Sequence, residues 1–237
     1  MAKALRNKVV SRDDWVKARK ALLAKEKKHE RERAKLAAAR RALPWEPVTK
    51  DYVFEGAAGK RSLADLFDGR SQLVIYHFMF DPSWDEGCAH CSWWADNFDH
   101  PMQHLNHHDV SFAVVSRAPQ AKLAAYRKRM GWSFPWVSSF GNDFNFDCNV
   151  AFTPAEVKSK RGFYNFKWQD PLAPEREGLS VFYKDAKGRI YRTYSTFARG
   201  IDPINLDYQF IDMTPKGREE KGGDNQYWIR RHDEYAR

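Results

Sequence analysis

Two cysteines separated by two residues are the side chains of this sequence best suited to chemistry. Cys88 and Cys91 enclose Ala89 and His90. When a C-x-x-C opens a helix, its two sulfurs lie within reach of a disulfide, and the free N–H groups of the first turn stabilise a thiolate. The spacing therefore predicts a thiol–disulfide oxidoreductase in which Cys88 attacks as the thiolate and Cys91 resolves the mixed disulfide.

Charged neighbours of the pair act in opposite directions. A protonated His90 would lower the pKa of Cys88 and favour the reduced form, whereas the carboxylates of Asp85 and Glu86 would raise that pKa. The sequence leaves the sign of the net effect open.

Metal or cofactor binding without redox turnover is the alternative function. A C-x-x-C can form half of a zinc site, with His77 and His90 as further ligands, but no second C-x-x-C completes it. His104 and His108 have the i, i+4 spacing that can share a metal ion, yet no carboxylate or cysteine is clearly placed beside them. Redox chemistry is therefore favoured over metal binding and over two buried structural thiols, and we expect neither a metal nor another cofactor.

Four nearby side chains are candidates for the lining of a substrate pocket at the thiols. Trp84, Trp93 and Trp94 lie close to the pair in sequence and either form the floor of that pocket or pack the helix onto a sheet. His77 either faces the thiols or lies in the core. Cys148 is interpreted as a lone structural thiol rather than a third redox partner.

The elements that must position these residues follow an α/β pattern. Two apolar runs without alternation indicate strands buried on both faces, at Leu73–Phe80 and 110–116. The cysteine pair follows the first run, at the edge where open α/β sheets carry their chemistry. Helices are predicted to begin at Cys88 and to span 62–67 and 120–130, and further strands are predicted at 52–54 and 134–139. Residues 179–183 and 190–194 are predicted to form a hairpin. Residues 141–177 show no periodicity. The pattern predicts an α/β fold with a mixed sheet flanked by helices.

Length and composition fit one globular domain with extensions. The chain has 237 residues, 43% of them hydrophobic, and a net charge of +9, which excludes a wholly disordered protein. No apolar run approaches the roughly 18 residues of a membrane span, and the basic first 30 residues lack the apolar segment of a secretory signal. Three cysteines are too few for a disulfide-stapled secreted fold. We therefore expect a cytoplasmic protein without a membrane partner.

The positive charge belongs to an N-terminal arm. Residues 1–43 contain 15 Lys and Arg against 5 Asp and Glu, and the rest of the chain is nearly neutral. Ser11 is the predicted N-cap of one long helix that ends before Pro44, with a narrow apolar stripe of Trp15, Ala18 and Leu22. Acidic residues interrupt the positive face, so nucleic acid is not the expected partner. We expect the stripe to pack on the body or on a second subunit, as in a homodimer.

Three parts of the chain follow from these patterns. Residues 1–44 form the basic helical extension, 45–212 the α/β domain, and 213–237 a polar tail. Within that tail, the apolar run at 227–229 is expected to dock on the body.

Several segments give the sequence a specific resemblance. Arg61–Phe67, followed by Leu73–Phe80 and the cysteine pair, is similar to the opening of a thioredoxin-like, peroxiredoxin-like domain. More closely, the chain resembles a bacterial family called domain of unknown function 899, through Phe80–Asp96, Gly178–Lys184, Tyr194–Gly200, Met213–Gly217 and Trp228–Tyr235. The resemblance covers nearly the whole chain and implies a thioredoxin-like fold, but little about activity.

Departures from the better-known relatives limit what the resemblance implies. Peroxiredoxins place Thr or Ser three residues and Pro seven residues before the reactive cysteine, and here Asp85 and Asp81 occupy those positions. Thioredoxins have a cis-proline before the strand that faces the cysteines, and Gly178 occupies that approximate place, which adds it to the expected pocket. The expected partner is a thiol or disulfide substrate, or a small-molecule oxidant.

Overall fold

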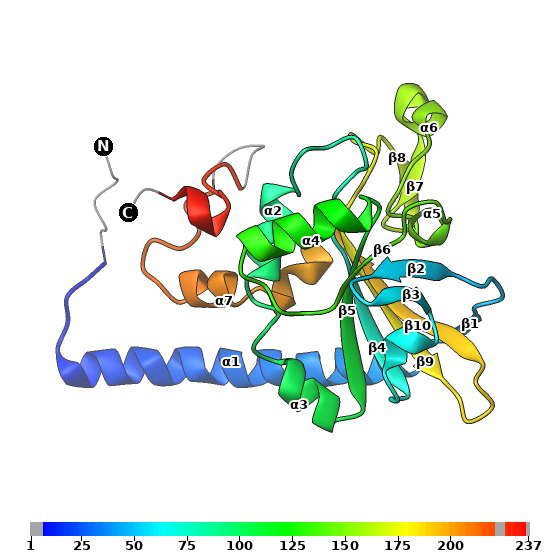
Figure 1. Ribbon diagram of the computed structural model, residues 1–237. Coiled ribbons are helices and arrows are strands. Elements are labelled where there is room, and N and C mark those ends of the chain that lie inside the picture. The colour runs from blue at the N-terminus through cyan, green and yellow to red at the C-terminus, as the bar shows by residue number, and fades with distance from the viewer. Residues whose placement is uncertain (1–6, 221–225, 236–237) are drawn as a thin grey trace.

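A mixed β-sheet forms the centre of the computed structural model, which describes residues 7–220 and 226–235 (Figure 1). Within those residues the sheet has eight strands in the order β1-β10-β9-β4-β5-β6-β2-β3, and β7 and β8 form a separate pair. The strands are β1 (Glu46–Pro47), β2 (Val53–Gly56), β3 (Gly59–Ser62), β4 (Gln72–His77), β5 (Val110–Ser116), β6 (Trp136–Ser138), β7 (Gly162–Tyr164), β8 (Lys167–Gln169), β9 (Gly178–Lys184) and β10 (Ile190–Phe197).

Helices lie on both faces of this sheet (Figure 1). The α-helices are α1 (Arg12–Arg41), α2 (Ala89–Ala95), α3 (Met102–His107), α4 (Gln120–Arg129), α5 (Phe144–Asp147), α6 (Pro154–Ser159) and α7 (Leu206–Asp212). Short 3₁₀ turns are η1 (Asp65–Phe67), η2 (Ala198–Ile204) and η3 (His232–Glu234). Residues of α2, α4 and α7 pack on one face, and η1 and α5 pack on the other.

The strand directions confirm the predicted fold class. β4, β5 and β6 run parallel, joined by helical crossovers, whereas β9 runs antiparallel to β4 and β10 antiparallel to β9. The order β5-β4-β9-β10, with a helix after β4 and another after β5, is that of a thioredoxin-like domain. The predicted hairpin is β9–β10, whose turn ends at Gly188 with a φ of 79°.

The predicted strand at 73–80 is shorter in the structure. β4 ends at His77, because its neighbour β9 begins opposite that residue at Gly178. The chain beyond then leaves the ladder: the N–H of Phe80 donates to the Glu175 carboxylate at 2.6 Å, and the carbonyl of Met79 accepts from Cys88. The last apolar residues of the run therefore turn the chain toward the cysteine pair.

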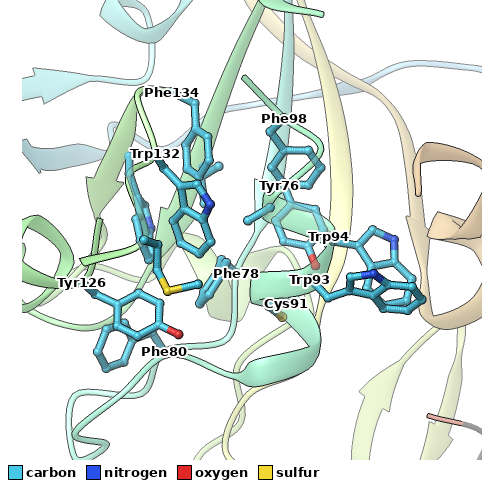
Figure 2. Packing of buried hydrophobic residues seen from close by; sticks show 14 of the residues in the cluster. Tyr76, Phe78, Phe80, Cys91, Trp93, Trp94, Phe98, Tyr126, Trp132 and Phe134 are labelled. Carbon is cyan, nitrogen blue, oxygen red and sulfur yellow. The ribbon is translucent and has the colours of Figure 1, made fainter. Parts of the chain in front are cut away.

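Alternation along β4 divides the core into two clusters. Tyr76 lies in an aromatic cluster with residues of α2 and α4 (Figure 2). In the same cluster, the ring of Phe78 meets that of Trp136 at a centroid distance of 4.8 Å. Ile75 lies in the opposite cluster, which Phe54, Phe144 and Phe182 fill. Since both faces are covered, most residues of β4 and β5 are buried, as their unbroken apolar runs predict.

The N-terminal helix α1 extends along the outside of the molecule (Figure 1). Ser11 caps it as predicted, by accepting a hydrogen bond from the N–H of Asp14. Trp15 and Leu22 remain 58% and 50% exposed, so their stripe does not pack on the described part of the body. Packing on a second subunit stays a prediction. No helix of the described residues is long and apolar enough to cross a membrane.

The C-terminal tail contacts the body next to α2. Ile229 is 4% exposed inside the aromatic cluster, and the ring of Trp228 meets that of Trp93 at 5.0 Å. Arg231 reaches further, with its Nε donating to the hydroxyl of Tyr126 at 2.7 Å. Two of the three residues in the predicted docking run are thus packed on the domain, and Tyr227 is exposed.

Candidate active site

The cysteine pair lies at the start of α2, directly after the chain leaves β4. Cys88 is the N-cap residue, its N–H donates to the carbonyl of Met79 at 3.1 Å, and its carbonyl accepts from the N–H and hydroxyl of Ser92, each at 2.9 Å. Gly87 precedes it in a gap that only glycine fits, because an added Cβ would lie 2.7 Å from the Phe78 ring. The backbone at Cys88 is therefore fixed by its hydrogen bonds to Met79 and Ser92 and by the tight packing of Gly87.

The two thiols have opposite surroundings. Cys91 is 2% exposed, and its sulfur accepts a hydrogen bond from the N–H of Met79 at 3.5 Å, whereas Cys88 is only partly buried. Hydrogen bonds to the Cys88 sulfur, from Cys91 first and then His90, hold the pKa of Cys88 well below its usual value against the cost of desolvation. Burial, together with the neighbouring Cys88, raises the pKa of Cys91 well above its usual value. The thiolate is therefore favoured at Cys88 and disfavoured at Cys91.

The net effect of the neighbouring charges on the pKa of Cys88, which the sequence left open, favours the thiolate. His90 hydrogen-bonds to Cys88, which raises the pKa of the imidazole. Glu86 is occupied elsewhere, because Arg231 approaches it at 3.0 Å and Arg129 also forms an ion pair with it. The acidic residues before the pair thus do not outweigh the hydrogen bonds at the Cys88 sulfur.

A cavity of about 360 Å³ opens beside the two sulfurs. Its wall combines the cysteine pair with apolar groups, with side chains of both charges, and with one residue of the tail. The lining residues are Tyr76, Met79, Cys88, His90, Cys91, Trp94, Arg176, Glu177, Ala198, Arg199, Ile201, Asp202 and Gln226.

His77 and Trp93 do not line this cavity. His77 points to the opposite face of the sheet, where its Nε2 lies 2.9 Å from the Ser180 hydroxyl and burial lowers its pKa to about 3. Its neighbour Tyr76 faces the thiols instead, because side chains alternate along a strand. Trp93 is 5% exposed and packs toward α7, its Nε1 donating to Asp207 at 2.5 Å. Its neighbour Trp94 (Figure 2) lines the cavity.

Trp84 and Gly178 also lie outside the lining. Trp84 is partly buried against the aromatic cluster, in the loop before the cysteines. Gly178 pairs with His77 in the sheet, and the space of its missing Cβ is filled by the Phe197 ring at 2.6 Å. The two residues before it, Arg176 and Glu177, reach the cavity instead.

Several lining residues were not singled out from the sequence, among them Tyr76, Arg176, Glu177 and Gln226. Tyr76 lies beside Cys91, and burial with the nearby thiol raises its pKa well above the usual value. Arg176 and Glu177 come from the loop entering β9, and Gln226 comes from the tail. Because side chains alternate along a strand, Tyr76 could have been identified as the residue that faces the thiols if His77 does not. Arg176 and Glu177 could have been identified because they directly precede Gly178, which was expected in the pocket. Nothing in the sequence links Gln226 to the thiols.

A buried ionic cluster supports the loop that carries the cysteines. Glu175 is 1% exposed, and Arg117 lies between it and Asp81, at 3.7 Å and 3.2 Å. Burial raises the pKa of Glu175 to about 8. Because the same carboxylate accepts the N–H of Phe80, the cluster fixes the point at which the chain turns from β4 toward Cys88.

The remaining metal and thiol candidates lie elsewhere. Cys148 is buried in the opposite cluster from the cysteine pair, and burial raises its pKa to about 12. His104 lies in α3 and His108 caps it, away from the cavity lining. In the described ranges, no three His, Cys, Asp or Glu side chains form a group that could hold a metal ion.

Comparison with other proteins gives a family and distant structural relatives. The model of a family described as "Bacterial protein of unknown function (DUF899)" matches residues 4–235. Among solved structures, peroxidoxin BcpB from Mycobacterium tuberculosis is 14% identical with a TM-score of 0.41, and the match covers 71% of this chain and 97% of that one. Peroxiredoxin Q from Xanthomonas campestris is 14% identical with a TM-score of 0.43, covering 70% and 95%. No curated protein matches the chain.

Proposed function

The chain belongs to the DUF899 family of bacterial proteins, and we propose that it is a thiol–disulfide oxidoreductase with Cys88 as nucleophile and Cys91 as resolving thiol. The observation that carries this proposal is the difference between the two thiols: one stabilised as a thiolate beside a cavity, the other buried and protonated. A dithiol acts in this order when the accessible sulfur is the better nucleophile at ambient pH.

The reaction begins with the Cys88 thiolate. It attacks one sulfur of a disulfide R–S–S–R, forms the mixed disulfide Cys88–S–S–R, and releases the first thiolate. The Cys91 thiol then loses its proton and attacks the Cys88 sulfur, which releases the second thiolate and leaves a Cys88–Cys91 disulfide. The substrate gains two electrons, the protein loses two, and a dithiol reductant restores the starting state.

His90 and Tyr76 have positioning roles in this scheme. The imidazole of His90 hydrogen-bonds to the Cys88 sulfur and stabilises its thiolate both as attacking group and as leaving group. Tyr76 lies beside Cys91 and interacts with its thiol, and because Cys91 is only 2% exposed, its sulfur is reached from Cys88 rather than from solvent. Stabilisation of the thiolate also favours the reduced protein, which makes its disulfide the more oxidising.

Trapping of the mixed disulfide tests the proposal. With Cys91→Ser, we expect the reduced protein to accumulate a stable adduct of one disulfide half on Cys88, seen as a mass increase after acid quenching. With Cys88→Ser, we expect no adduct and no intramolecular disulfide. Cys148→Ser is the matched control and should oxidise as the parent protein does. Full disulfide exchange by both Cys88→Ser and Cys91→Ser would overturn the proposal.

A further inference from the structure

Within the described part of the chain, Arg176 lines the cavity at the thiols without forming an ion pair. Among residues 7–220 and 226–235, no carboxylate lies within ion-pairing distance of its guanidinium, and its Nε is buried without a hydrogen-bond partner. A buried donor without a partner costs free energy, and a ligand that is not present can supply the missing acceptor. This side chain therefore points to an acceptor that enters the cavity with the substrate.

The position of Arg176 is fixed by its surroundings. Its backbone N–H donates to the carbonyl of Val150 at 2.9 Å, and its guanidinium stacks over the ring of Tyr164 at 5.0 Å. Tyr164 is itself anchored, since its hydroxyl donates to the carbonyl of Glu177 at 2.9 Å and accepts from the N–H of Ala198 at 3.0 Å. A guanidinium held on a rigid aromatic surface loses little freedom when it binds a carboxylate or a phosphate.

The other charges of the cavity are engaged within the protein. Arg199 pairs with Asp202 at 2.9 Å, and Arg218 also approaches Asp202 at 3.2 Å. His90 is hydrogen-bonded to Cys88. Glu177 accepts a hydrogen bond from the hydroxyl of Tyr164 at 3.3 Å. Among the described residues, Arg176 is thus the lining cation without an ion pair, and its anchors on Val150 and Tyr164 restrict where a negative group of the substrate can lie.

From this arrangement we infer that the cavity binds a small disulfide bearing a carboxylate or similar anion, which Arg176 holds while Cys88 attacks. The inference rests on the proposed oxidoreductase function and adds the substrate class. A cavity of about 360 Å³ is at the small end of the range for small-molecule sites. Arg176 is thus a specificity-determining residue, and the sulfur chemistry stays with the cysteine pair.

Three small disulfides of different charge test the inference. The reduced full-length protein is mixed with excess 3,3′-dithiodipropionate (anionic), 2-hydroxyethyl disulfide (neutral) or cystamine (cationic), and the rate of Cys88–Cys91 oxidation is measured by acid quenching and mass spectrometry. Each rate constant is divided by that of the same disulfide with free dithiothreitol, which removes intrinsic reactivity. The parent protein should prefer the anionic disulfide over the neutral one by about 10-fold, the size of a charge-assisted hydrogen bond.

Two substitutions identify the residue responsible. Arg176→Gln should abolish the preference for the anionic disulfide while the neutral disulfide reacts within about 3-fold of the parent rate, because the cysteine pair is untouched. Arg161→Gln is the matched control: Arg161 also stacks on an aromatic ring, that of Trp168, but lies outside the cavity. It removes the same charge and should leave the preference intact.

The outcomes separate this inference from the function on which it rests. If 2-hydroxyethyl disulfide oxidises the pair but the anionic disulfide has no advantage, or if Arg176→Gln and Arg161→Gln behave alike, the inference is wrong and the oxidoreductase stands. A preference for cystamine would show that Glu177 dominates the cavity, and it would also overturn the inference. If none of the three disulfides oxidises the pair, the proposed function itself fails.

Discussion

On one face of the sheet, Cys88 begins a helix beside a cavity; on the other, Cys148 ends a helix inside the core. Cys88 is the N-cap of α2 and accepts hydrogen bonds from Cys91 and His90, whereas Cys148 is the C-cap of α5 and is 3% exposed. The pKa falls at the first thiol and rises to about 12 at the second. The comparison shows that donors and access, rather than the residue type, decide which cysteine of this fold can react.

The largest effect is expected when the reactive cysteine, Cys88, is replaced. Cys88→Ser should lower the rate of protein oxidation by a small disulfide at least about 10³-fold, since a hydroxyl is not ionised at neutral pH and is a weak nucleophile. Cys148→Ser should change that rate by less than about twofold. Stopped disulfide exchange with mass spectrometry measures both, and equal losses in the two variants would contradict the assignment.

A second prediction concerns the buried face, where His77 is kept neutral. Its pKa of about 3 in the folded protein lies below the value near 6.5 of an unfolded histidine, so the unfolded chain takes up a proton first as the pH falls. This contribution to stability is complete above pH 6.5 and is lost between pH 6.5 and 3, by up to about 1.4 kcal/mol per pH unit. His77→Phe should flatten that acid-side slope.

Urea unfolding at several pH values between 4 and 7 measures this slope. The hydrogen bond to Ser180 is also lost in the variant, but that loss shifts the whole curve and leaves its pH dependence untouched. An unchanged slope in His77→Phe would mean that His77 is not buried as a neutral group.

A third prediction concerns Glu175, which supports the loop before the cysteines and whose pKa is raised by burial, whereas burial lowers that of His77. Its folded pKa of about 8 lies above that of an unfolded glutamate, about 4.3. Its contribution to stability is therefore present below about pH 4.3 and is lost as the pH rises through 8. Glu175→Gln should flatten the slope of the unfolding free energy between about pH 4.3 and pH 8, by about as much as His77→Phe flattens the acid side, because the two pKa shifts are of similar size. Unfolding curves between pH 5 and 9 decide this, and an unchanged slope would contradict it.

The smallest effect expected is at His90. Since its hydrogen bond helps to hold the Cys88 thiolate, His90→Ala should move the midpoint of the pH profile for Cys88 alkylation upward, toward that of an ordinary thiol. Iodoacetamide modification followed by peptide mass spectrometry gives the profile, with the unreactive Cys148 as internal control. A midpoint that stays in place would assign the shift of Cys88 to Cys91 alone.

The sequence was sufficient for the framework that positions the thiols. Unbroken apolar runs identified β4 and β5 because both faces of these strands are covered, and the turn at Gly188 identified the β9–β10 hairpin. The short elements between 141 and 177 were missed, because three- and four-residue elements such as β7 and α5 hold too few residues to show a period.

The side chains around the thiols were less predictable. On a strand buried on both sides, composition does not tell which of two neighbours faces the site, so the sequence left the direction of His77 open, and Tyr76 faces the thiols instead. The same ambiguity applies to Trp93 and Trp94 on α2, of which only Trp94 lines the cavity. Arg176 approaches the thiols from more than 80 residues away in sequence, and only the pairing of β9 with β4 brings it there.

The most direct test of the central claim is a redox titration of the Cys88–Cys91 pair, by thiol trapping and mass spectrometry across ratios of reduced to oxidised glutathione. The hydrogen-bonded thiolate at Cys88 and the buried thiol at Cys91 predict a reversible two-electron transition, with a midpoint in the range of roughly −270 to −120 mV that working dithiols of this fold span. Failure of any intramolecular disulfide to form under oxidising ratios would contradict the account.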